Sequence, residues 1–191
     1  MSQHKLPLMQ LKIYVLITKL IFLNFEGNHI IRTNEIVTLY HGPKSGIRGT
    51  IAPVSRKQCE FGSEFYMGTD RTQPLTLICN HPNARIYTLG VNLSDLKILD
   101  VEAGLDWALL VAYHRGKMES VRHSAIYNRF VNLSKDCDMI IGYVANNSMF
   151  VVLARFFNGE ITDMALINSL SAWKLGKQYA ALTEKACEKN P

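Results

Sequence analysis

Short apolar runs recur along the chain, and turn residues separate them. Over residues 85–91 the side chains alternate between two faces with a period of two, the pattern of a half-buried strand. The run 36–40 ends at His41-Gly42-Pro43, a turn signal. We predict strands over residues 36–40, 61–68, 85–91, 97–101 and 138–144.

Other segments have the composition and end signals of helices. Residues 106–115 are apolar on nearly every face and end before Gly116, so this helix should be largely buried. Residues 148–157 follow two asparagines that can cap a helix, and Thr162 or Asp163 caps a third helix that runs to about Leu170. Residues 71–80 have helical spacing, with Pro74 restricting the helix to a start near it.

The order of these elements predicts the fold class. Strands and helices are interspersed without the strict alternation of a parallel sheet, which favours an α+β fold with a mostly antiparallel sheet. Residues 44–60 are polar and hold Gly46, Gly49 and Pro53, so we expect a loop. The segment 178–187 is ambiguous, because its alanines favour a helix although it follows a turn at Gly176.

The length of 191 residues fits one domain with an appendage. We place the domain at 36–191 and treat 1–35 as a variable N-terminal extension, with a linker over 24–34. The apolar run 11–25 contains two lysines, and no run of 18 uncharged apolar residues occurs, so we expect no transmembrane helix. A signal peptide is not favoured, since no small-residue cleavage site follows the run.

Charge and cysteine content say little about the ligand and the compartment of the protein. The 21 basic and 16 acidic residues give a net charge of +5, which permits an anionic ligand without requiring one. A basic stretch over 115–129 can be a solvated loop or a surface for a polyanion; its members are Arg115, Lys117, Arg122 and Arg129, with His114 and His123 between them. Four widely spaced cysteines indicate reduced thiols and a cytoplasmic protein, although a secreted or delivered effector stays open.

Common catalytic templates are missing, but two short motifs carry chemistry. The sequence has no Walker loop, no GxGxxG, no HExxH and no GxSxG. In Leu39-Tyr40-His41-Gly42, a histidine ends a strand and the glycine lets a ligand approach the backbone. In residues 61–68 (FGSEFYMG), Tyr66 lies on an aromatic strand and can stack on a flat heterocycle. Taken alone, a histidine that ends a strand is usually a hydrogen-bonded structural residue, and an aromatic residue on a strand usually belongs to the core.

The order of these motifs resembles the ADP-ribosyltransferase superfamily, in the branch that shares features with poly(ADP-ribose) polymerases. The resemblance covers residues 36–188 and rests on LYHG, on FGSEFYMG and on the segment YTLGVNLSDLKILDV. The chain looks most similar to an uncharacterised bacterial domain family of that superfamily. The resemblance implies a split antiparallel β-sheet core with flanking helices, and NAD as the co-substrate without a metal ion.

The resemblance also implies roles for individual residues. His41 would bind the 2′-hydroxyl of the adenosine ribose of NAD, and Gly42 would clamp the nicotinamide carboxamide through its backbone. Tyr66 would stack on the nicotinamide ring, and Tyr40 belongs to the same cofactor-binding set. The third motif corresponds to residues 177–182 (KQYAAL), where Gln178 takes the place of a glutamate. This match implies that at least residues 178–182 form a strand.

Three residues depart from the pattern of the superfamily. Gln178 supplies a neutral amide where a carboxylate usually stabilises an oxocarbenium-like state, a loss of roughly 1–2 kcal/mol or about ten- to thirtyfold in rate. Glu64 replaces a glycine, as a solvated loop residue or as a substitute carboxylate near the cofactor. Pro43 replaces a serine and removes a backbone donor beside Gly42.

The sequence therefore leads to one main function and two alternatives. The first is an NAD-dependent mono-ADP-ribosyltransferase with Gln178, His41 and Tyr66 as catalytic residues and an unknown acceptor, which can be a protein, a nucleic acid or a small molecule. The second is a catalytically weak or inactive module of the same fold that binds NAD or ADP-ribose. The third is a nucleic-acid or protein binder that uses the basic stretch over 115–129.

Overall fold

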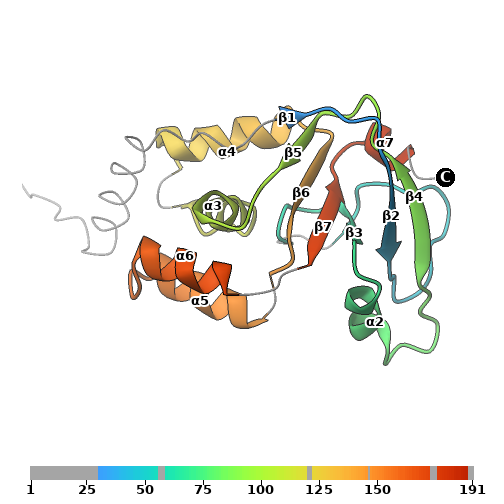
Figure 1. The fold of residues 1–191 in the computed structure, drawn as a ribbon, viewed down its shortest axis with the longest axis horizontal. Helices are drawn as coiled ribbons and strands as arrows, with labels where there is room; N and C mark the ends of the chain where they lie inside the picture. The colour runs from blue at the N-terminus through green and yellow to red at the C-terminus, as the bar shows by residue number, and fades with distance from the viewer. Residues whose placement is uncertain (1–29, 56–58, 120–121, 146, 173–175, 189–191) are drawn as a thin grey trace, which may run out of the picture.

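The computed structural model describes residues 30–55, 59–119, 122–145, 147–172 and 176–188 (Figure 1). The extension predicted over 1–35 therefore lies outside the described residues except at its end. The described elements are β1 (Ile30–Ile31), β2 (Ile36–His41), β3 (Phe65–Gly68), α2 (Thr72–Ile78), β4 (Tyr87–Asn92), β5 (Ile98–Asp100), α3 (Leu105–His114), α4 (Ala125–Lys135), β6 (Met139–Tyr143), α5 (Asn147–Phe157), α6 (Asp163–Ser171), β7 (Lys177–Ala181) and α7 (Glu184–Glu188).

The described strands form one seven-stranded sheet in the order β1-β5-β6-β7-β3-β2-β4. Neighbouring strands run antiparallel except β5 and β6, which run parallel. The chain is thus an α+β protein with a mostly antiparallel sheet, as the sequence pattern predicts. The C-terminal strand β7 lies in the interior of the sheet, between β6 and β3, so residues distant in sequence become direct neighbours.

Helices cover the two faces of the sheet unequally. Helices α3, α4, α5 and α6 gather beside β5, β6 and β7 (Figure 1) and share one apolar core with Leu99, Ile140 and Ala180 of the sheet. Successive residues of a strand point to opposite faces. The residues directly beside these three in sequence, Ile98, Met139 and Ala181, accordingly belong to a second core on the other face. This core also includes Ala186 and Cys187 of α7.

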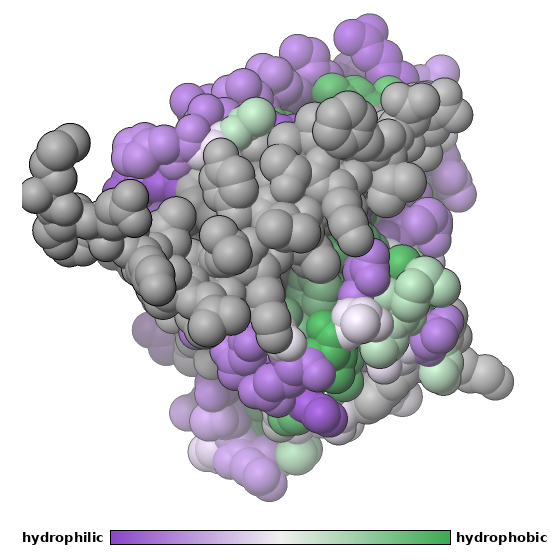
Figure 2. Space-filling model, turned by 90° about the vertical axis from the view of Figure 1, so that its left-hand side faces the viewer, coloured by the Kyte–Doolittle hydropathy of each residue, from purple (hydrophilic) through white to green (hydrophobic). Residues whose placement is uncertain are grey.

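The side of the molecule that carries the helical layer has both polar and apolar surface. Figure 2, turned so that the left-hand side of Figure 1 faces the viewer, shows hydrophilic residues around the rim and a hydrophobic strip in the lower half of the view. Val151 of α5 and Met164 of α6 are 59% and 60% exposed, so apolar side chains reach the surface of these two helices. No helix in the described part of the chain is long and apolar enough to span a membrane.

Most predicted elements are confirmed, with ends shifted by no more than two residues. Trp107 to Ala112 of α3 are all buried, as expected for a helix that is apolar on nearly every face. Thr162 is the N-cap of α6, and its hydroxyl accepts from the backbone N–H of Ala165 at 3.2 Å. Residues 177–181 form β7, so the strand implied by the resemblance overrides the helical propensity of the alanines.

Two predictions from the pattern are wrong in detail. The predicted linker over 24–34 includes Ile30–Ile31, which pair with β5 as a two-residue edge strand too short to show a period. The strand predicted over 61–68 begins only at Phe65, since Gly62 has a φ of +101° that breaks the extended backbone.

Helix α4 has no counterpart in the prediction, because the stretch 115–129 was interpreted from its charges. The Ser124 side chain caps this helix by accepting from the N–H of Tyr127 at 3.3 Å, and Phe130 is buried in the core. Arg129 therefore lies on a helix and not on a solvated loop.

Gly142 of β6 leaves room for two aromatic rings that pack between the sheet and α3. A Cβ atom at Gly142 would lie 2.6 Å from Cζ of Phe61 and 3.3 Å from Cδ1 of Trp107, and both rings are fully buried. We expect Gly142→Ala to lower the free energy of unfolding by about 1–3 kcal/mol, because the rings must shift. Urea unfolding measures this change. Gly90→Ala is the matched control, since no atom lies within 4 Å of its added Cβ; equal stability of the two variants would contradict the packing.

Candidate functional site

The three motifs singled out in the sequence lie on three adjacent strands. The first motif forms the end of β2, the second forms β3, and the third forms β7, and these strands are neighbours in the order β7-β3-β2. The segments that carry His41, Tyr66 and Gln178 are thus brought together, although up to 137 residues separate them in the chain. This convergence is the geometric condition for a shared site.

Four residues form a continuous row across the sheet. Tyr40 pairs with Gly68, Gly68 with Gln178, and Gln178 with Gly142. Directly paired residues point to the same face. The side chains of Tyr40 and Gln178 therefore leave the same face, and the space beside the two glycines is taken by Gln73 at Gly68 and by Phe61 at Gly142.

Gln178 is buried, with 7% of its surface exposed. Its Nε2 donates to the backbone oxygen of Tyr143 at 3.2 Å, and the same oxygen accepts from Nε1 of Trp107 at 3.2 Å. With its NH₂ group held this way, the Oε1 atom of Gln178 is the part of the amide that can accept from a ligand hydroxyl.

Tyr66 lies two residues before Gly68 on β3, and its ring is on the same face as Gln178. Its hydroxyl accepts from the N–H of Phe61 and donates to the oxygen of Gly62, both at 2.9 Å. Burial raises the pKa of Tyr66, so the phenol stays protonated at neutral pH. The hydroxyl fixes the loop before β3, which leaves the ring as the part of Tyr66 suited to stacking.

His41 is joined to Tyr66 through the backbone, but its ring lies elsewhere. Its Nδ1 is 2.7 Å from the oxygen of Tyr66, while the imidazole packs against Phe65 at a centroid distance of 4.3 Å. Phe65 and Tyr66 are consecutive in β3, so their side chains leave opposite faces. The structure therefore brings Tyr40, Tyr66 and Gln178 onto one face and places the His41 ring beside the other.

The contact with Tyr66 determines the tautomer of His41. A carbonyl oxygen only accepts, so Nδ1 carries the proton and donates. Burial lowers the pKa of His41, although the bond to Tyr66 opposes this effect. The ring is therefore neutral at pH 7, and its Nε2 can accept from a hydroxyl group.

Gly42 lies directly beneath α2. A Cβ at this position would be 2.6 Å from Cβ of Pro74 and 3.2 Å from Cδ1 of Ile78. The same helix holds Gln73, whose amide lies so close to Gly68 and Gly176 that a Cβ on either glycine would overlap with it. Helix α2 thus covers both the end of β2 and the glycine beside Gln178.

Two ionisable groups, Glu64 and His114, lie beside Gly62. Oε1 of Glu64 and Nδ1 of His114 are within 3.0 and 3.3 Å of the position that a Cβ on Gly62 would take. Burial raises the pKa of Glu64 to about 7 and lowers the pKa of His114 to about 4. Glu64 is therefore half-buried beside the Tyr66 loop and not a fully solvated residue.

The basic stretch over 115–129 does not act as one block of free charge. Arg115 contacts Glu60 at 3.5 Å, and Arg122 contacts Glu119 at 3.5 Å. The low pKa of His114 keeps its ring neutral at pH 7. Among the described residues, no three His, Cys, Asp or Glu side chains gather in a way that would hold a metal ion.

The raised pKa of Glu64 makes stability depend on pH. Folding shifts this pKa from 4.5 to about 7, so the folded protein takes up a proton within this window. The free energy of unfolding should therefore fall as pH rises from 4.5 to 7. Glu64→Gln should remove this part of the decline, making the variant more stable than wild type at pH 7.5 by about 1 kcal/mol after allowance for partial exposure. Urea unfolding at a series of pH values measures the difference, and identical profiles for both proteins would contradict the shift.

Comparison with known proteins gives a family match that covers most of the chain. No curated protein and no solved structure gives a significant match to the chain. One family matches residues 37–189, which contain the three motif strands and nearly all of the described fold. The chain belongs to this family, which is described as a protein of unknown function (DUF3990).

Proposed function

We propose that the protein is an NAD-binding mono-ADP-ribosyltransferase that transfers ADP-ribose to an acceptor and releases nicotinamide. The observation that carries the proposal is the convergence of the three motif strands, which makes Tyr40, Tyr66 and Gln178 neighbours on one face. The resemblance of these motifs to the ADP-ribosyltransferase superfamily supplies the chemistry. We also propose that the sheet corresponds to the split antiparallel core of that superfamily.

NAD would occupy the face of the sheet that holds Tyr66. The ring of Tyr66 would stack on the nicotinamide, while its hydroxyl keeps the preceding loop in place. The backbone of Gly42 would pair with the carboxamide at the end of β2. The His41 ring lies beside the other face, so NAD would have to pass the end of β2 for a ribose hydroxyl to donate to its Nε2.

The transfer reaction needs a group that holds the ribose while its bond to nicotinamide breaks. The bond between the ribose C1′ and the nicotinamide nitrogen breaks, and its electron pair neutralises the positive ring. The acceptor's lone pair then forms the new bond to C1′, and the acceptor proton leaves to a base. Gln178 would accept a hydrogen bond from the nicotinamide ribose through Oε1, because its NH₂ group is already engaged by Tyr143.

Glu64 is suited to receive the proton of the acceptor. A carboxyl group with a pKa of about 7 is partly ionised at neutral pH, so a fraction of it is free to accept a proton. Its ionised form also binds a proton more strongly than an ordinary carboxylate does. Glu64 also lies within electrostatic range of Tyr66, since its charge contributes to the raised pKa of that phenol. It would supply part of the carboxylate chemistry that Gln178 lacks.

Isothermal titration calorimetry with NAD, combined with chromatographic detection of released nicotinamide, tests the proposal. We expect wild type to bind NAD and release nicotinamide. His41→Ala and Tyr66→Leu should each weaken binding by about three- to tenfold, because each loses one hydrogen bond or one stacking contact. Tyr66→Phe should keep NAD binding within about threefold while losing stability, because it retains the ring and loses the two loop contacts.

His81→Ala is the matched control, since His81 is an exposed histidine in the turn after α2. It should bind NAD as wild type does. Binding without nicotinamide release would favour the alternative of an inactive NAD or ADP-ribose module. Equal binding by wild type, His41→Ala and Tyr66→Leu would refute the assigned site.

A further inference from the structure

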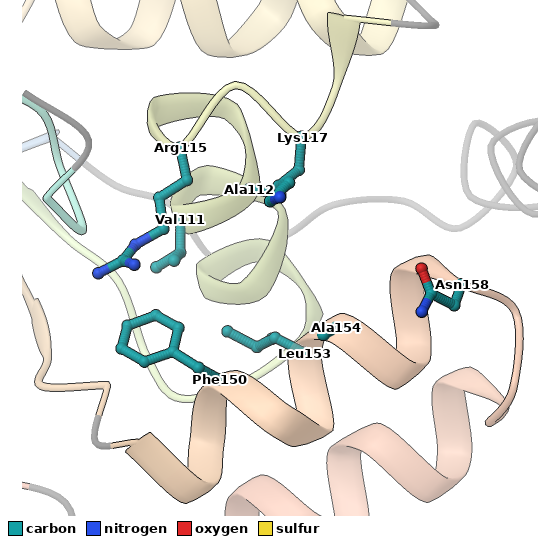
Figure 3. Close-up of a pocket in the computed structure, with 8 residues that line it drawn as sticks. All are labelled: Val111, Ala112, Arg115, Lys117, Phe150, Leu153, Ala154 and Asn158. Atoms are coloured by element: carbon teal, nitrogen blue, oxygen red, sulfur yellow. The ribbon is translucent and has the colours of Figure 1, made fainter.

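A cavity of about 270 Å³ lies between α3 and α5, apart from the row that holds Gln178. Its walls are mostly apolar, with Val111 from α3 and Phe150 and Leu153 from α5 (Figure 3). Polar groups come from Arg115, Lys117 and Asn158. A cavity of roughly 150 Å³ holds benzene, so this one has room for a longer alkyl chain or a substituted ring.

Arg115 is a polar residue of the cavity wall that contacts both an aromatic ring and a carboxylate. Its guanidinium carbon lies 3.8 Å from the centre of the Phe150 ring, and Figure 3 shows the side chain reaching from the end of α3 toward that ring. Its Nη2 makes one long contact, 3.5 Å, with Oε1 of Glu60. Its Nε is buried and has no acceptor among the described residues. Since this Nε has almost no accessible surface, a ligand in the cavity would contact the exposed part of Arg115, whose side chain is 29% exposed.

The charge around the cavity favours an anion. Arg115 and Lys117 both line it, whereas Glu60 is the carboxylate in contact with Arg115. The dipole of α3 adds only about half a negative charge at the C-terminal end of the helix, and its effect is limited to the last turn. The two cations therefore leave a positive balance beside an apolar wall.

We propose that this cavity binds a small carboxylate with an apolar body, and that Arg115 is its anchor. A carboxylate has two oxygens that match the planar fork of a guanidinium, and it would bind through the exposed part of Arg115, with Lys117 as a second cation on the cavity wall. The alkyl or aryl body would lie against Phe150 and Leu153. The inference does not require the proposed NAD chemistry.

Binding at Arg115 would compete with Glu60. Glu60 precedes Phe61, whose N–H donates to the hydroxyl of Tyr66 at 2.9 Å. The carboxylate in the cavity would thus release one contact of the loop that holds Tyr66. Removing the charge of Glu60 should accordingly strengthen the binding of an added carboxylate.

Calorimetry with octanoate tests the inference, with 1-octanol as the neutral ligand of the same length. We expect octanoate to bind, and to bind at least tenfold more tightly than octanol, because charge-assisted hydrogen bonds distinguish the two. Arg115→Met keeps most of the apolar length and should weaken octanoate binding at least tenfold. Glu60→Gln should strengthen it by up to about fivefold, the range of a partly exposed ion pair.

Arg155→Met is the matched control, because Arg155 is an exposed arginine of α5 that contacts Glu160 and does not line the cavity. It should leave octanoate binding unchanged. Two further variants decide the matter if Arg115→Met does not fold: Lys117→Met should weaken binding about threefold, and Ala154→Trp should abolish it by filling the cavity. Absence of octanoate binding, equal affinity for octanoate and octanol, or full binding by folded Arg115→Met or Ala154→Trp would overturn the inference.

Discussion

The pairing of β7 with both β6 and β3 is the constraint on which the remaining architecture depends. This strand joins the half of the sheet beside α3–α6 to the half that carries β2 and β4. Its residues Ala180 and Ala181 belong to the two separate cores, so one strand supports both faces. The same strand presents Gln178 between Gly68 and Gly142, so the candidate site and the fold share one set of backbone hydrogen bonds.

Several side chains serve the site and its packing at once. The Tyr66 hydroxyl fixes Phe61 and Gly62, and Phe61 in turn fills the space left open by Gly142. Gly42 permits the close approach of Pro74, which positions α2 over the end of β2. The glycine for which we propose backbone contact with the ligand is therefore also required by the packing of α2.

The sequence predicted the α+β class and most elements, because apolar periodicity and cap residues are local signals. The strand at 177–181 was different: Ala180 and Ala181 favour a helix by propensity, and only the motif resemblance indicated a strand. Helix α4 was not predicted, because the charge pattern over 115–129 does not indicate it. Its signals are the Ser124 cap and the apolar Phe130, which is buried in the structure. The shifted pKa values of Glu64 and His114 depend on burial by distant segments, which no local pattern records.

The position of nicotinamide on the sheet tests the central claim most directly. Addition of nicotinamide to ¹⁵N-labelled protein, followed by amide chemical-shift mapping, reports where the ring binds. The account predicts that the largest shifts cluster on the three adjacent strands, at Gly42, Tyr66 and Gln178. Shifts confined to other elements, or no shifts at saturating nicotinamide, would contradict it.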